Sequence, residues 1–90
     1  MPIIDKSREG SDLVVTVRGT LTQLGLTQLS QRLPSRAEVG RDKLVIRFVH
    51  CGFFSPVLEA AVRRLIKQRL QLSSYQFQLV LVREQPRLTN

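Results

Sequence analysis

The chain has 90 residues, of which 42% are hydrophobic, and its 14 Lys+Arg outnumber its 7 Asp+Glu to give a net charge of +7. This length supports one domain with one modest core and excludes a second. The single cysteine cannot form an internal disulfide, and no Cys/His cluster has zinc-site spacing. We therefore expect no metal or cofactor.

The positive charge indicates an acidic partner, which is a nucleic acid, an anionic membrane surface or an acidic protein. No apolar run approaches the roughly 20 residues of a membrane-spanning helix. The first residues, MPIIDKSREGSDL, lack the charged-then-apolar order of a secretory signal. We therefore expect a cytoplasmic protein.

The first elements expected are two strands. Residues Leu13 to Arg18 combine β-branched side chains with partial alternation and stop at Gly19, which indicates a strand. Ile3 and Ile4 are expected to form a short edge strand, joined to it by a tight turn through EGSD.

A helix follows in TLTQLGLTQLSQRL, where leucines recur at helical spacing. Thr20 or Thr22 caps its start, and it ends before Pro34. Gly25 weakens a helix, and we expect close approach to the sheet to be its compensation. The next segment, PSRAEVGRDK, is expected to be a solvated loop.

The second half predicts a strand and a well-marked helix. The run LVIRFV, Leu44 to Val49, is typical of a central strand covered on both faces, although Arg47 interrupts it. Ser55 then caps a helix, Pro56 takes its first position and Glu59 lies near the positive end of its dipole. The buried stripe of this helix is expected to be Leu58, Val62, Leu65 and Ile66.

Gln76 to Val82 alternates as a further strand, and residues 83–90 are expected to be a flexible tail. The order β(β)αβαβ predicts a single small α/β domain over residues 1–90. Its three- or four-stranded sheet carries both helices on one face if the crossovers are right-handed.

The sequence offers little chemistry for catalysis. His50 and Cys51 are neighbours at a strand end, where consecutive side chains point in opposite directions, and no third group orients them. No phosphate-binding glycine motif and no paired carboxylates occur. We expect no enzyme, and the alternative, an enzyme that uses Cys51, requires a reactive thiol.

The strongest surface signal is basic. The candidate partner-binding residues are Arg63, Arg64, Lys67 and Gln71 on the second helix, with Arg36, Arg41 and Lys43 adding to the field. A charged helix face is often only a solvated surface, but the excess of positive charge favours binding. Only Tyr75 and four phenylalanines are aromatic, and the phenylalanines are expected to be buried, which gives little support to base stacking.

The pattern as a whole, from about Leu13 to Val82, resembles STAS domains, the fold of bacterial anti-sigma factor antagonists. GTLTQLGLTQLSQRL is similar to the family's strand-to-helix segment, and KLVIRFVHCGFFSPVLEAAVRRL is similar to its central strand, switch loop and following helix. The segment after the last strand is short for the family's closing helix. The resemblance implies a shortened domain that docks another protein.

The family's phosphorylated Asp-Ser/Thr-Ser-Gly motif is missing. The ungapped match places Ser55, Pro56 and Val57 on its first three positions, so the phosphoacceptor position falls on a residue without a hydroxyl. Ser55 remains a switch-loop candidate only if the match shifts, and the acidic residue of the family's central strand is Arg47 here. The resemblance therefore implies docking without phosphorylation control.

These observations favour a non-enzymatic protein–protein interaction module, regulatory or part of a larger complex, that docks an acidic partner through the basic helix. A second copy of the chain is a further partner to consider. The alternative is a DNA- or RNA-binding domain in which the same side chains neutralise phosphates.

Overall fold

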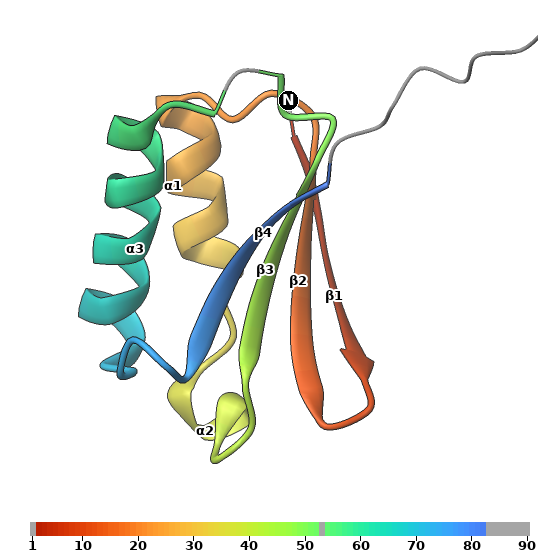
Figure 1. The fold of residues 1–90 in the computed structure, drawn as a ribbon, viewed down its shortest axis with the longest axis vertical. Coiled ribbons are helices and arrows are strands. Elements are labelled where there is room, and N and C mark those ends of the chain that lie inside the picture. The colour runs from red at the N-terminus through yellow and green to blue at the C-terminus, as the bar shows by residue number, and fades with distance from the viewer. Residues whose placement is uncertain (1, 53, 83–90) are drawn as a thin grey trace, which may run out of the picture.

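The computed structural model describes residues 2–52 and 54–82; the predicted tail, 83–90, and Phe53 lie outside this range. The elements are β1 (Ile3–Glu9), β2 (Asp12–Arg18), α1 (Gln23–Arg32), α2 (Arg36–Val39), β3 (Leu44–Val49), α3 (Pro56–Leu70) and β4 (Phe77–Val82). The strands form one sheet in the order β1-β2-β3-β4, in which β1 is antiparallel to β2 and the other pairs are parallel. Helices α1 and α3 cover one face, as Figure 1 shows. The predicted α/β architecture is confirmed.

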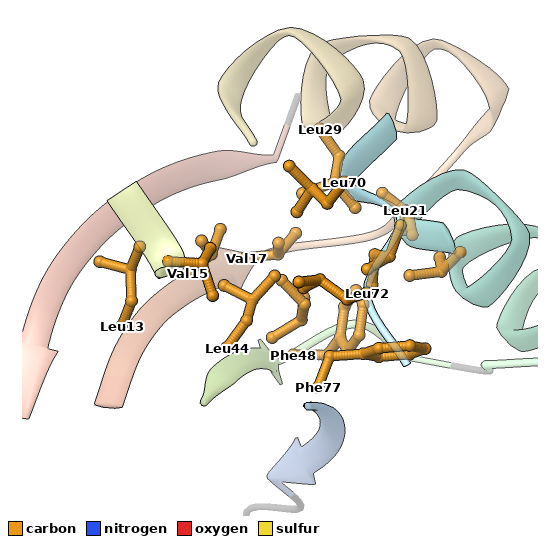
Figure 2. Close-up of a cluster of buried hydrophobic side chains, with 14 of the residues drawn as sticks. Leu13, Val15, Val17, Leu21, Leu29, Leu44, Phe48, Leu70, Leu72 and Phe77 are labelled. Atoms are coloured by element: carbon orange, nitrogen blue, oxygen red, sulfur yellow. The ribbon is translucent and has the colours of Figure 1, made fainter. Parts of the chain in front are cut away.

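The core lies between the sheet and the two long helices. Figure 2 shows side chains of β2, β3 and β4 meeting Leu29 of α1 and Leu70 of α3. Thr22 caps α1 and Ser55 caps α3, each accepting a hydrogen bond from a backbone N–H of the first turn. Gly25 is buried, but its close neighbours are Leu21 and Pro2 rather than the sheet that we expected.

Strand β1 is longer than the two isoleucines predicted, because it continues to Glu9 before the turn at Gly10, where φ is 64°. Most of its side chains are exposed, so it carries no apolar alternation, and Ile4 packs against the core. The register with β2 therefore depends on the turn and on polar contacts made by the charged side chains.

Arg47 explains how the second face of the sheet is covered. Its guanidinium donates two hydrogen bonds to the Glu9 carboxylate, at 3.0 and 3.1 Å. Strand β2 lies between these two residues, so the Arg47 side chain crosses it. Val14, on the same face of β2, is only 1% exposed, although neither α1 nor α3 covers this face. The residue that interrupts the apolar run of β3 thus covers its neighbours with its long side chain.

The predicted loop between α1 and β3 is wrong in one respect, because it contains the short helix α2. Ser35 and Glu38 form a capping box, in which the Ser35 hydroxyl accepts from Glu38 N–H and the Glu38 carboxylate accepts from Ser35 N–H, at 3.1 and 3.2 Å. Val39 buries its side chain in the core. The Ser-x-x-Glu pattern that marks such a start was present in the sequence.

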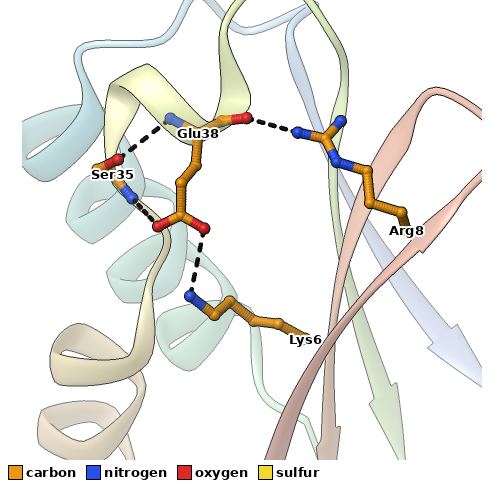
Figure 3. A network of polar contacts seen from close by, with 4 residues as sticks. All are labelled: Lys6, Arg8, Ser35 and Glu38. Atoms are coloured by element: carbon orange, nitrogen blue, oxygen red, sulfur yellow. Dashed lines mark hydrogen bonds and ion pairs between the residues drawn. The ribbon is translucent and has the colours of Figure 1, made fainter.

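Two basic residues of β1 bind α2, as Figure 3 shows. Lys6 contacts the Glu38 carboxylate at 3.4 Å, and Arg8 donates to the Glu38 carbonyl oxygen at 2.7 Å. Arg8 also pairs with Asp42 at 2.8 Å. These contacts join the polar edge strand to the segment that leads into β3.

The capping box predicts an acid-sensitive stability. The hydrogen bond from Ser35 N–H, together with Lys6, lowers the pKa of Glu38 from its usual 4.5. Because the folded pKa is depressed, this contribution is present above about pH 4.5 and is lost as pH falls through the folded pKa. Urea unfolding between pH 6 and pH 3 should show a smaller loss of stability for Glu38→Gln than for the wild type. An equally large loss in both proteins would contradict the assignment.

Candidate interaction surface

The structure separates the predicted basic residues into two groups. Arg64 and Lys67 are exposed on α3 and make no ion pair within the described residues, whereas Arg63 is half-buried and pairs with Glu59 at 3.1 Å. The other group comprises Gln71 at the end of α3, Arg36 on α2, and Arg41 and Lys43 in the segment that follows α2. The Arg63 guanidinium is therefore already engaged by Glu59 of its own helix, and the predicted α3 cations that are exposed are Arg64 and Lys67.

The second group lies near the end of the sheet where β3 and β4 begin. Gln71 ends α3 in a left-handed conformation with φ of 53°, and its side-chain oxygen accepts a hydrogen bond from Arg36 at 3.5 Å. Arg41 and Lys43 are exposed in the connection from α2 to β3. Arg36 thus contacts Gln71. Arg41 and Lys43 lie near the end of the sheet and not on the outer face of α3.

A shallow groove runs between α1 and α3, with a volume of about 350 Å³. Its lining combines apolar and small residues with two polar side chains of α3: Leu26, Thr27, Ser30, Ala61, Arg64, Leu65 and Gln68. Each helix contributes a small side chain to the lining, Ser30 on α1 and Ala61 on α3. We had named Arg64 from the sequence, but not the apolar floor beside it.

The most exposed apolar residues of the two helices lie one turn before residues that line this groove. Leu24 is 59% exposed and lies three residues before Thr27 on α1, and Val57 is 80% exposed and lies four residues before Ala61 on α3. Residues at these spacings lie one above the other on a helix. Leu24 and Val57 therefore lie about one turn before the groove residues Thr27 and Ala61, toward the starts of the two helices.

The charge around the groove is positive. Glu59 is the only acidic residue of α1 and α3, and it already pairs with Arg63. The exposed cations of these helices without an ion pair among the described residues are Arg32, Arg64, Lys67 and Arg69. Since the nearby acid is occupied, the potential at the groove favours an anionic partner.

In the loop from β3 to α3, the described polar side chains of Ser55, His50 and Cys51 lie in separate environments. The Ser55 hydroxyl accepts from Leu58 N–H at 3.1 Å, so it acts as a helix cap. His50 is exposed, whereas Cys51 is buried with its sulfur 3.7 Å from the carbonyl oxygens of Val17 and Val49. The two side chains lie in different environments, as expected for consecutive residues at a strand end.

Within the described residues, no three His, Cys, Asp or Glu side chains gather as metal ligands would. None of the helices in this part of the chain is long and apolar enough to cross a membrane. Comparison with known proteins finds no matching family model, no similar curated protein and no similar solved structure. The STAS resemblance remains a hypothesis, and the function is argued from the surface itself.

The buried thiol gives a direct test of Cys51 chemistry. Burial raises the pKa of Cys51, and a thiol in this state is a poor nucleophile at neutral pH. A dithionitrobenzoate reagent should label the folded protein slowly and the urea-unfolded protein rapidly. Rapid labelling of the folded protein would instead support an enzyme that uses this cysteine.

Proposed function

We propose that this protein is a non-enzymatic interaction module that binds an acidic, amphipathic segment of another protein in the groove between α1 and α3. The observation that carries the proposal is an apolar groove whose bordering helices hold unpaired cations and no free acidic residue. An amphipathic helix that places its apolar side chains in a groove is a recurrent mode of protein recognition.

Each part of the surface has a distinct role in this mode. Leu26, Ala61 and Leu65 offer apolar surface to the anchor residues of the partner, and burial of such anchors supplies most of the binding energy. Arg64 and Lys67 attract carboxylates, which sets orientation and association rate more than affinity. The STAS resemblance supports docking of a protein, in a regulatory role or as a subunit of a larger complex.

The apolar floor distinguishes this proposal from simple charge attraction. Ala61→Met fills the groove without changing the charge, so it should weaken binding of a protein partner by about tenfold or more. Arg64→Glu should also weaken binding, whereas Arg18→Glu is the matched control, because Arg18 is exposed at the end of β2 and makes no ion pair in the described part of the chain. Pull-downs from nuclease-treated lysate identify the bound protein. Titration of that protein then measures its affinity for each of the three variants.

The result that would overturn the proposal is a captured partner whose affinity is the same for wild type and Ala61→Met. Equal losses for Arg64→Glu and Arg18→Glu would show that only net charge matters. Circular dichroism of each variant verifies that the fold is retained.

A second candidate is supported by Tyr75. This side chain is 84% exposed, and the following residue, Gln76, donates to the Gly40 carbonyl oxygen at 3.0 Å. The tyrosine therefore lies in a segment that contacts the turn before Arg41 and Lys43. Proteins that bind single-stranded nucleic acid combine exposed aromatic rings with cations on the same surface.

Nucleic-acid binding makes a different quantitative prediction. A labelled single-stranded oligonucleotide should lose affinity by about 0.7 log units per log of salt for each phosphate neutralised. Tyr75→Ala should weaken its binding through loss of stacking, by about 1–3 kcal/mol, and Ala61→Met should have no effect. Salt-independent or undetectable binding would reject this candidate.

A further inference from the structure

The two edges of the sheet differ in how they are protected. Edge strand β1 carries four charged residues, Asp5, Lys6, Arg8 and Glu9, and two of them, Lys6 and Arg8, contact Glu38 of α2. Edge strand β4, FQLVLV, has no charged residue and no proline, and its Leu81 is 45% exposed. Proteins commonly protect edge strands with charged side chains, because an unprotected edge offers unpaired N–H and C=O groups to another strand. The edge formed by β4 lacks this protection.

The register of β4 shows which backbone groups are free. Leu44 N–H donates to the Gln76 carbonyl oxygen at 3.0 Å, and Leu44 lies opposite Phe77. In a parallel pair, alternate residues direct both backbone groups to the same neighbour. Gln78, Val80 and Val82 therefore bond to β3, and the remaining β4 residues, Phe77, Leu79 and Leu81, direct their N–H and C=O groups to the outer edge.

We propose that this edge pairs with β4 of a second copy of the chain, antiparallel and centred on Leu79. In this register Leu79 lies opposite Leu79 of the second copy, and Phe77 lies opposite Leu81 of the second copy. Each of the three outward-directed residues then donates one hydrogen bond and accepts one. The two sheets join into one continuous sheet, and the two-fold symmetry is that of the commonest homo-oligomers.

The side chains also agree with this register. Phe77, Leu79 and Leu81 point to the helix side of the sheet, so each pair formed there between the two copies is apolar. On the other face, Gln78 lies opposite Val80 of the second copy. Strand β4 has no charged residue, so pairing two copies of it places no like charges opposite each other. For the same reason, it offers no cation to an acidic extended peptide. The edge thus fits a second copy better than it fits the acidic partner proposed for the groove.

The dimer and the groove respond oppositely to salt. Each copy has a net charge of +7, so dimerisation brings like charges together and should strengthen as salt screens them. Binding of an acidic partner should weaken with salt. The groove lies between α1 and α3 and the dimer edge lies at the margin of the sheet, so either proposal can fail without the other.

Sedimentation equilibrium over micromolar to submillimolar concentrations at moderate salt tests the inference. The wild type should approach twice the 10.3 kDa mass of one chain. Leu81→Pro removes an outward N–H that β3 does not use, so it should abolish the dimer while the fold persists. The matched control, Leu81→Val, keeps the N–H and should remain dimeric. A wild type that stays monomeric over the whole range would overturn the proposal.

Cross-linking tests the register even if Leu81→Pro fails to fold. Gln78 and Val80 of the second copy form a non-hydrogen-bonded pair, whose Cα atoms are about 4.5 Å apart, within disulfide range. The double variant Gln78→Cys/Val80→Cys should form a covalent dimer on mild oxidation, and neither single variant should. Absence of this dimer, or a covalent dimer of Val80→Cys alone, would overturn the Leu79-centred register. The wild type, whose Cys51 is buried, is the background control.

Discussion

The structure depends on burying both faces of β2 and β3 in a domain whose two long helices cover only one. On the helix side, α1 and α3 supply the second layer. On the other side, Arg47 reaches across β2 to Glu9, and its long side chain covers apolar residues such as Val14. The pair is exposed, so its electrostatic contribution to stability is small. Its main role is to cover apolar surface and to hold β1 in register.

The arrangement of acids and bases leaves an excess of positive charge on the helix face. Glu9, Glu38 and Asp42 pair with Arg47, Lys6 and Arg8, and all three pairs connect β1 with its neighbours. A further pair, Arg63 with Glu59, engages the only acid of α1 and α3. The acids thus stabilise the sheet edge and α2, and the helix face keeps an excess of positive charge. The ion pairs that join β1 to the rest of the fold and the proposed partner surface therefore lie on different parts of the molecule.

The parts of the fold that could be predicted from the sequence are those with local physical signals. Ser55 and Pro56 mark the start of α3, and the apolar run from Leu44 predicts β3, because capping and burial act over a few residues. Strand β1 was underestimated because its side chains are polar and its partners, Glu38 and Asp42, are distant in sequence. The groove could not be predicted because it depends on how α1 and α3 pack. Of its lining, Arg64 was named in advance as a binding residue, whereas Leu65 was expected to belong to the buried stripe of α3.

The two proposed surfaces have a joint consequence. A dimer through β4 carries two α1–α3 grooves in fixed orientation, so a partner with two acidic segments would gain avidity without any new contact. The gain depends on salt in a specific way, because salt strengthens the dimer and weakens each groove contact. Avidity should therefore be greatest at intermediate ionic strength, where dimers are populated and the cations of α3 still attract carboxylates. Because the continuous sheet fixes the distance between the two grooves, only a partner whose acidic segments match that distance can occupy both.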